Sequence, residues 1–320
     1  MSPFLLTRTL PEDATGAALR ADVLHGLTRT PKSLPPKWFY DARGSALFDE
    51  ITTLPEYYPT RAEREILVAR SAEIAEATGA RTLVELGSGS SEKTRHLIDA
   101  LPSLHTYVPV DVSESALTGA ANTLLAERPA LNVHALIADF TRGLALPGTP
   151  GPRLVAFLGG TIGNLLPAER TAFLTSVRGL LSPGDALLLG TDLVKDESVL
   201  VSAYDDAAGV TAAFNKNVLH VVNRELGADF DPDAFAHVAV WDRDHEWIEM
   251  RLRARAAQTV KVPALDLAVH FERNEELRTE ISAKFREEGV KSELAAADLS
   301  LTHWWTDERS RFALSLSTPA

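Results

Sequence analysis

Cysteine is absent from the 320-residue sequence. Its absence excludes disulfide bonds, thiolate catalysis and zinc sites built from cysteine. No apolar run reaches the roughly 18 residues that a membrane span requires. The N-terminal stretch "MSPFLLTRTLPEDATG" lacks the long apolar segment and the small-residue cleavage site of a signal peptide. We therefore expect a cytoplasmic protein with no membrane partner.

Basic residues are scarce relative to acidic ones. The sequence has 32 Lys and Arg against 44 Asp and Glu, a formal net charge of −12. This balance disfavours nucleic-acid binding, which needs concentrated positive charge to neutralise phosphates. The nine histidines show neither H-x-H nor H-x-x-x-H spacing, so we predict no metal site. The length fits one large or two small domains, and we expect a monomer that acts on a small molecule.

From residue 82 onward, strand-like apolar runs alternate with helical segments. Such alternation predicts a doubly wound α/β domain with a parallel sheet and right-handed crossovers. Thr60 and Glu63 form a T-x-x-E pattern, which predicts a capping box opening a helix over 61–79. The predicted strands are 82–86, 106–112, 132–140, 153–159 and 186–193, and the predicted helices are 92–101, 113–127 and one that begins at Pro167.

The segments around this domain predict a second one of a different kind. Residues 196–226 have a helical pattern, and "HVAVWDRDHEWIEMRLRAR" predicts two strands around a polar turn. We therefore expect an α+β domain made of residues 1–59 and 196–285. The first domain then comprises 60–195 and 286–320, because the C-terminal "LTHWWTDERSRFALSLS" predicts a strand, a turn and a strand that return to its sheet.

A glycine loop, "VELGSGSSEKT" at 84–94, joins the first predicted strand to a helix. Backbone N–H groups and the helix dipole point outward from such a loop and favour a ligand, although a tight turn without a ligand has the same pattern. A dinucleotide site would read G-x-G-x-x-G, but Glu92 occupies the third glycine position. A carboxylate there is a poor neighbour for a pyrophosphate, and Glu85 before the loop suits a cationic or amine-bearing ligand better.

The loop resembles the first motif of class I S-adenosylmethionine (SAM) methyltransferases. Asp111, at the end of the second strand, stands where this fold places an acid for ribose hydroxyls, and Asp139 with Phe140 after the third strand suits an adenine pocket. The fourth strand ends in "FLGGTIGNLLP" instead of the Asn- or Asp-Pro-Pro-aromatic motif of many N-methyltransferases. Methylation of nucleic-acid bases is therefore disfavoured, and Asn164 offers both a donor and an acceptor to another substrate.

Longer segments carry a more specific resemblance over nearly the whole chain. The sequence is similar to the L-histidine Nα-methyltransferase family of ergothioneine biosynthesis in "PKSLPPKWFYDARGSALFDEITTLPEYYPTRAE", "FLGGTIGNL", "LGTDLVKD", "YDDAAGVTAAFNKNVL" and "THWWTD". The resemblance implies a Rossmann-like class I methyltransferase sheet with a second, substrate-binding α+β domain. It further implies that SAM methylates the α-amine of L-histidine three times to give hercynine.

The resemblance also implies roles for individual residues. Tyr40 would line the amine side of the substrate, and Glu280 and Ser282, which share one face of a strand, would hydrogen-bond the imidazole. The implied cofactor-binding residues are Glu85, Gly87, Gly89, Lys93, Asp111, Asp139, Phe140 and Gly159. The implied substrate-binding residues are Tyr57, Asn164, Tyr204, Met250, Glu280, Ile281 and Ser282, and the implied catalytic residues are Tyr40, Tyr57 and Asn164.

Methyl transfer to an amine requires the neutral amine, which is a minority form at pH 7. No strong base is evident, so we expect Tyr40 and Tyr57 to orient the amine and to pass protons through water. Three alternatives stay open from the sequence. They are an N-methyltransferase for another amino acid or small amine, a nicotinamide-dependent oxidoreductase, and a catalytically silent SAM-binding protein.

Overall fold

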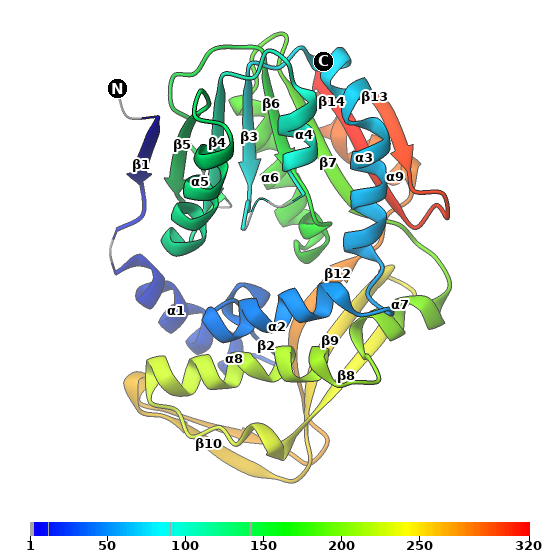
Figure 1. The fold of residues 1–320 in the computed structure, drawn as a ribbon. Helices are drawn as coiled ribbons and strands as arrows, with labels where there is room; N and C mark the ends of the chain where they lie inside the picture. Colours follow the sequence, from blue (N-terminus) through cyan, green and yellow to red (C-terminus); the bar gives the residue numbers. More distant parts are fainter. Residues whose placement is uncertain (1–2, 12, 90, 92, 141–142) are drawn as a thin grey trace. The chain divides into compact units, whose positions relative to one another are not determined.

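Two compact units are built from alternating pieces of the chain (Figure 1). The computed structural model describes residues 3–11, 13–89, 91, 93–140 and 143–320. The first unit consists of Met1–Pro11, Pro59–Val194 and Phe285–Ala320, and the second of Glu12–Tyr58 and Lys195–Lys284. Each unit has its own hydrophobic core, because their large clusters of buried side chains share no residue.

An eight-stranded sheet forms the centre of the first unit (Figure 1), with the order β1-β5-β4-β3-β6-β7-β14-β13. The strands from β1 to β7 are parallel, whereas β14 and β13 are antiparallel. This confirms the predicted α/β class and the return of the C-terminal strands to the sheet. The strands are β1 (Phe4–Arg8), β3 (Thr82–Leu86), β4 (Thr106–Asp111), β5 (Asn132–Ile137), β6 (Arg153–Phe157), β7 (Ala186–Asp192), β13 (Leu299–Thr306) and β14 (Phe312–Pro319).

The first strand, β1, corrects the expectation that all of residues 1–59 belong to the second domain. It pairs in parallel with β5, with Phe4 opposite Val133. Phe4 and Leu6 pack against a small core cluster that includes Ala135. The pairing extends the sheet beyond β5 and covers apolar side chains there, so the N-terminal strand joins the first unit.

Helices cover both faces of this sheet. α3 (Pro59–Thr78), α4 (Arg95–Ala100) and α5 (Glu114–Glu127) share one core with the strands, as their position in Figure 1 also shows. α6 (Pro167–Leu180) packs on α9 (Glu287–Ala296) and, through Phe173, on Phe157 of β6. All five residues of β3 are buried, as expected for a strand covered on both faces. The helix predicted over 92–101 begins at Arg95, and Glu92 lies outside the described residues.

The second unit combines helices with a β10-β11 hairpin and a sheet of the order β2-β12-β9-β8, in which the short strand β2 is parallel to β12 and the other pairs are antiparallel. The segment 196–226, predicted to be helical, forms two helices separated by residues 205–209, where Gly209 adopts φ of +78°. The elements are α1 (Ala14–Thr28), β2 (Lys32–Ser33), the 3₁₀ helix η1 (Pro36–Phe39), α2 (Ala42–Thr53), α7 (Glu197–Tyr204), α8 (Val210–Leu226), η4 (Pro232–Ala234), β8 (Phe235–Asp242), β9 (Trp247–Ala254), β10 (Gln258–Val262), η5 (Pro263–Leu265), β11 (Leu267–Phe271) and β12 (Glu276–Ala283).

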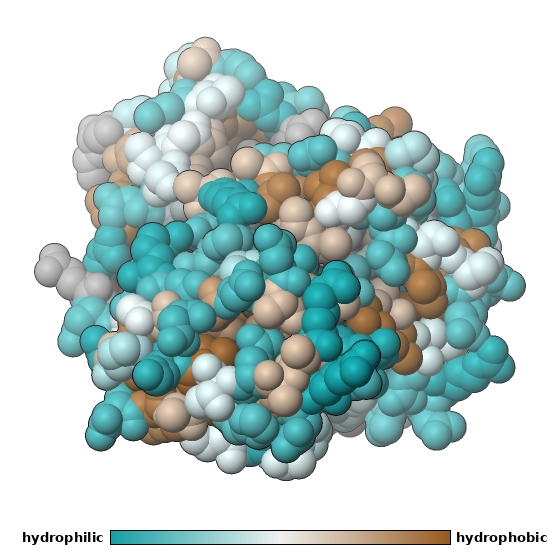
Figure 2. Space-filling model, turned by 90° about the horizontal axis from the view of Figure 1, so that it is seen from below, coloured by the Kyte–Doolittle hydropathy of each residue, from teal (hydrophilic) through white to brown (hydrophobic). Residues whose placement is uncertain are grey.

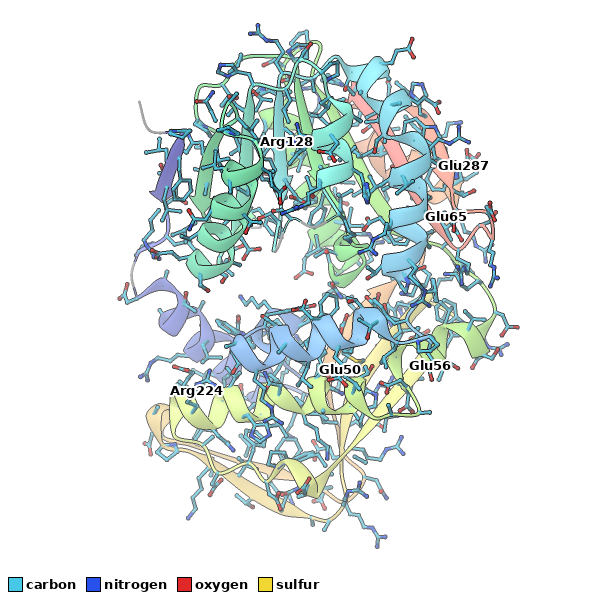
Figure 3. All side chains as sticks on the ribbon, viewed as in Figure 1. Glu50, Glu56, Glu65, Arg128, Arg224 and Glu287 are labelled. Atoms are coloured by element: carbon cyan, nitrogen blue, oxygen red, sulfur yellow. The ribbon has the colours of Figure 1, made fainter. Side chains whose placement is uncertain are left out.

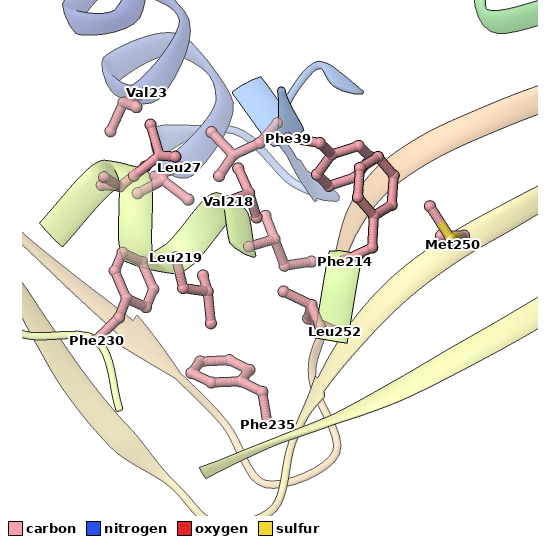
Figure 4. Close-up of a cluster of buried hydrophobic side chains, with 14 of the residues drawn as sticks. Val23, Leu27, Phe39, Phe214, Val218, Leu219, Phe230, Phe235, Met250 and Leu252 are labelled. Atoms are coloured by element: carbon pink, nitrogen blue, oxygen red, sulfur yellow. The ribbon is translucent and has the colours of Figure 1, made fainter. Parts of the chain in front are cut away.

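The core of the second unit surrounds α8 (Figure 4). Phe39 and Phe214 lie close together, with ring centroids 4.8 Å apart, and Met250 extends from the neighbouring strand. Phe235 is fully buried, which stabilises the fold by roughly 1.5–3 kcal/mol relative to an exposed side chain. These contacts bring η1, α8 and the sheet into one cluster.

The surface is mainly polar. Figure 2 shows small hydrophobic groups separated by hydrophilic side chains on the face seen from below. Exposed ion pairs occur at Arg224, which contacts Asp41 at 2.7 Å, and at Arg128, which contacts Asp99 (Figure 3). Such pairs contribute only about 0–1 kcal/mol each, so the two cores dominate stability. Within the described residues, no helix combines the length and the apolar character needed to cross a membrane.

Candidate active site

The glycine loop follows β3 at the carboxyl edge of the parallel strands. Gly87 and Gly89 have φ values of +69° and +50°, which residues with a Cβ rarely adopt. The Gly87 N–H donates to the Val110 carbonyl (2.8 Å), and a Cβ on Gly87 would lie 3.5 Å from the Phe140 ring. The buried Ser88 Oγ has no hydrogen-bond partner among the described residues. The loop therefore offers close backbone approach and one buried hydroxyl that a ligand can satisfy.

Asp111 ends β4 beside this loop. One of its carboxylate oxygens accepts from the Gly89 N–H (3.0 Å) and the other from the Ser113 N–H (2.9 Å). These bonds orient the carboxylate, and each oxygen keeps a further lone pair for a ligand hydroxyl. The structure thus brings together two of the residues expected at the cofactor, Gly89 and Asp111.

Phe140 lies beside the glycine loop. Its ring packs edge-on against Phe157 (5.3 Å) and Phe173 (6.0 Å), which hold it next to Gly87. Asp139 precedes it and is half-buried. The sequence predicts an adenine pocket at these two residues, where a ring lies beside a carboxylate.

The Glu85 side chain is buried, and its carboxylate is hydrogen-bonded by protein groups. Its two carboxylate oxygens accept from the hydroxyls of Thr94 and Tyr107, and the Tyr107 hydroxyl also hydrogen-bonds the Ser91 Oγ (2.7 Å). Burial raises the pKa of Glu85 to about 7, although these two hydroxyls and the Lys93 charge lower it in part. The side chain therefore stabilises the loop through Thr94 and through Tyr107, which contacts Ser91.

The capping box predicted at Thr60 and Glu63 is not formed. The helix α3 begins at Pro59, so Thr60 lies inside it, and the fully buried Glu63 points into the unit. One of its oxygens forms an ion pair with Lys93, and the other accepts from the Gly159 N–H (2.6 Å). Glu63 thus connects two residues that the sequence assigns to the cofactor.

Asn164 also belongs to the first unit. It ends the short helix η3 (Thr161–Asn164), which follows Gly159 and Gly160 with φ values of +79° and +69°. The two glycines turn the chain sharply after β6, so Asn164 is presented half-buried at the carboxyl end of that strand. Its position fits a ligand at the same edge of the sheet.

An aromatic group lines part of the second unit. Tyr40 packs edge-on against Phe48 (5.5 Å) and Phe214 (5.3 Å), and Tyr57 against Phe48 (6.1 Å) and Tyr204 (6.4 Å). Tyr40 is half-exposed, yet desolvation of its hydroxyl and the charge of Glu280 raise the pKa of Tyr40. The three predicted tyrosines therefore belong to one cluster, and Phe48 and Phe214, which the sequence reading omits, join them.

A β-bulge at Thr279 sets which side chains of β12 face this cluster. Across the bulge the register shifts by one residue, so that Glu280 rather than Thr279 lies opposite Met250. Glu280 and Ser282 therefore share the face of Met250, as predicted. The side chain of Ile281 points to the other face, so any contribution of Ile281 to this site comes from its backbone.

Ser282 and Tyr204 are held by a polar network. Their hydroxyls are 2.7 Å apart, and the buried Lys284 ammonium donates to Ser282 (2.8 Å) and to Tyr204 (2.9 Å). His237 Nε2–H donates to the Tyr204 carbonyl (2.8 Å), while its Nδ1 accepts from Asn215 (2.8 Å). Burial lowers the pKa of His237, which keeps the ring neutral in this arrangement.

Two further side chains were missed by the sequence reading for different reasons. Lys284 continues the i, i+2 spacing of Glu280 and Ser282, so strand alternation signalled its face. Glu63 carried no such signal, because its pattern also fits an exposed helix cap. Among the described residues, no group of three or more His, Asp or Glu side chains is arranged to hold a metal ion.

Along the chain, β4 and β5 are added on one side of β3, and β6 and β7 on the other. The glycine loop follows β3, so it begins at the point where the strand order changes direction. This geometry, with Asp111 and Phe140 at the same edge, defines an α/β domain for an adenosine-bearing cofactor. Residues 19–319 match the family model described as "Histidine-specific methyltransferase, SAM-dependent".

Relatives support the same family. A histidine N-alpha-methyltransferase of Mycolicibacterium smegmatis is 60% identical over 315 residues, which cover 98% of each chain. A protein of the same name from Mycobacterium tuberculosis is 59% identical over 96% of this chain and 97% of that relative. Ergothioneine biosynthesis protein 1 of Neurospora crassa is 32% identical over 62% of this chain and 23% of its own length. The chain belongs to the family of histidine-specific, SAM-dependent methyltransferases, which confirms the resemblance seen in the sequence.

Proposed function

We propose that this protein is an L-histidine Nα-methyltransferase that converts histidine to hercynine by three methyl transfers from SAM, the first step of ergothioneine biosynthesis. The observation that carries the proposal is 60% identity over 98% of the chain to a relative with that activity in its name. The fungal relative, named for ergothioneine biosynthesis, supports the pathway.

The first unit has the features of the cofactor site. Backbone at Gly87 and Gly89 allows close approach, the Ser88 hydroxyl is available to a ligand, and Asp111 keeps lone pairs for two ribose hydroxyls. SAM supplies a methyl group activated by a positively charged sulfur. We assign Phe140 to the adenine, and we assign Lys93, held by Glu63, to the amino-acid end of the cofactor.

The second unit has the features of a histidine site. Glu280 offers a carboxylate that accepts an N–H of an imidazole, and Ser282, on the same face, offers a hydroxyl. We assign Met250 to the apolar face of the ring, and Tyr57 and Tyr204 to the carboxylate or amine of the substrate. Asn164, which belongs to the first unit, is proposed as a further substrate-binding residue. Accordingly, we propose residues 12–58 and 195–284 as the substrate-binding unit.

Tyr40 is proposed to orient the amine rather than to act as a phenolate base. Its pKa is raised by desolvation and by Glu280, so the hydroxyl stays protonated at neutral pH. A protonated hydroxyl can still accept a hydrogen bond from the amine and donate to water, which carries the proton away. The protein's contribution is then mainly orientation and exclusion of water, since the methyl donor is intrinsically reactive.

The test is incubation of the purified protein with SAM and each of the twenty amino acids, followed by mass spectrometry. Histidine is expected to gain three methyl groups, with mono- and dimethylated forms appearing first. Preferential methylation of another amino acid or of a small amine would replace histidine as the substrate. Binding of NADH without binding of SAM would overturn the proposal as a whole.

The proposal also includes a monomeric protein of the cytoplasm with no nucleic-acid or membrane partner. The net charge of −12 supports the absence of a nucleic-acid partner. Size-exclusion chromatography with light scattering tests the oligomeric state, and a dimeric mass would overturn that part.

A further inference from the structure

Lys284 lies just beyond the end of β12 and is buried, with 4% of its surface exposed. Its Nζ is 2.8 Å from Ser282 Oγ and 2.9 Å from the Tyr204 hydroxyl, and it lies over the Tyr204 ring, 4.7 Å from the centroid. Lysine is rarely buried unless its charge is compensated. Two of its hydrogen bonds go to hydroxyls of the proposed histidine site.

The hydrogen bonds of these three residues restrict where the hydroxyl protons point. An ammonium only donates, so Lys284 occupies a lone pair on Ser282 Oγ and another on the Tyr204 hydroxyl oxygen. One of the two hydroxyl protons lies in the Ser282–Tyr204 bond of 2.7 Å. The remaining hydroxyl proton must then point out of the triad, whichever residue carries it.

The bulge at Thr279 places Glu280 on the same face as Ser282. A carboxylate only accepts hydrogen bonds, whereas the hydroxyl pair directed by Lys284 donates one. A neutral imidazole has one N–H and one unprotonated nitrogen, so it needs one acceptor and one donor. Glu280 and the hydroxyl pair together provide these two groups.

We propose that Lys284 is a positioning residue that makes the Ser282–Tyr204 pair a hydrogen-bond donor to the unprotonated nitrogen of the substrate imidazole. This inference rests on the proposed function and deepens it, because it assigns part of the specificity for histidine to a residue that need not touch the ligand. Without Lys284, the Ser282 and Tyr204 hydroxyls can rotate, and the donor is no longer enforced.

The first experiment compares L-histidine with β-(2-thienyl)alanine, a similar-sized amino acid whose ring has neither nitrogen. Lys284→Met is expected to lower kcat/KM for histidine by about 10- to 100-fold, as for loss of a buried donor to a substrate nitrogen. Activity on thienylalanine is expected to change less than about threefold, since its ring makes no such bond. Equal losses for the two substrates would show a general structural effect and overturn the inference.

A double-mutant cycle identifies the residue through which Lys284 acts. If Lys284 acts through the Ser282 hydroxyl, Lys284→Met should cause little further loss of histidine activity in a Ser282→Ala background. Additive losses would contradict the inference. Affinity for S-adenosylhomocysteine, measured by calorimetry, is the control, because the proposed cofactor residues belong to the first unit.

A third measurement uses the wild-type protein and does not depend on a variant that folds. Histidine labelled with ¹⁵N in the ring is bound near pH 7, and its nitrogen chemical shifts are recorded. One protonated and one unprotonated nitrogen are expected. Two protonated nitrogens would exclude a donor at Ser282 and overturn the inference. Failure of the wild type to bind or methylate histidine would instead overturn the proposed function.

Discussion

The acidic residues around the glycine loop differ in how much of their hydrogen-bonding capacity the protein uses. Asp111 accepts one backbone N–H on each oxygen and retains lone pairs. The two oxygens of Glu63 and of Glu85 contact protein groups, and both side chains are buried. We therefore propose Asp111 as a direct ligand group, and Glu63 and Glu85 as supports that position Lys93 and the loop.

Glu63→Gln tests the support of Lys93. The amide retains the size of the side chain and an acceptor for the Gly159 N–H, but it removes the charge that holds the ammonium. We expect S-adenosylhomocysteine to bind about tenfold more weakly, the usual loss for one charged hydrogen bond. Calorimetry measures this, with Glu76→Gln on the exposed face of α3 as the matched control. Equal affinities of the Glu63 variant and the wild type would show that the ion pair is unimportant for the cofactor.

Glu85 should make stability depend on pH in a particular window. Its pKa is about 7 in the folded protein, against 4.5 for the ordinary group. Between these values the folded state binds more protons than the unfolded state, so the free energy of unfolding should fall as pH rises from about 4.5 to 7. One pKa unit is worth about 1.4 kcal/mol, which limits the effect to about 3 kcal/mol.

Urea unfolding at several pH values between 4.5 and 9 measures this dependence. Glu85→Gln, which cannot ionise, should flatten the wild-type curve in that window and leave it unchanged above pH 8. An identical pH dependence in the two proteins would show that the carboxyl titrates normally.

At the scale of elements, the bulge in β12 decides which face carries Glu280, Ser282 and Lys284. A shift of one residue reverses every side chain of a strand. Insertion of one alanine between Glu280 and Ile281 should therefore turn Ser282 and Lys284 to the opposite face of β12 and abolish histidine methylation. Affinity for S-adenosylhomocysteine should stay within about threefold of wild type, because the variant leaves the first unit intact. Retained histidine activity would show that the register of β12 does not control the site.

The sequence pattern predicts the end of one element, β3, correctly but does not indicate the break between α7 and α8. β3 ends at Leu86, as predicted, because the apolar run stops at Gly87, whose positive φ ends the strand. The helical pattern over 196–226 indicates no break, yet residues 205–209 separate α7 from α8. The periodicity on both sides is helical, and only the structure reveals the break, at whose end Gly209 adopts φ of +78°.

At the scale of the whole molecule, the second unit is formed by two insertions into the chain of the first. If the units have the roles proposed here, each ligand should protect its own unit against hydrogen exchange. S-adenosylhomocysteine alone should slow exchange in 84–89 and 108–113, and histidine should slow exchange in 204–214 and 276–284. Mass spectrometry of peptides measures this. Protection of 276–284 by S-adenosylhomocysteine alone would contradict the division of roles.

The sequence by itself determined the α/β class, the residues of the glycine loop, Asp111 and Phe140 at the strand ends, and the family. These features depend on local pattern, since apolar runs end at glycine or acid and long motifs are contiguous. Only the tertiary structure decided that β1 joins the sheet, that Glu63 holds Lys93, and that Lys284 lies on Ser282 and Tyr204. The physical reason is that these contacts join residues 30 to 130 positions apart, or depend on a one-residue bulge, and no local periodicity encodes either.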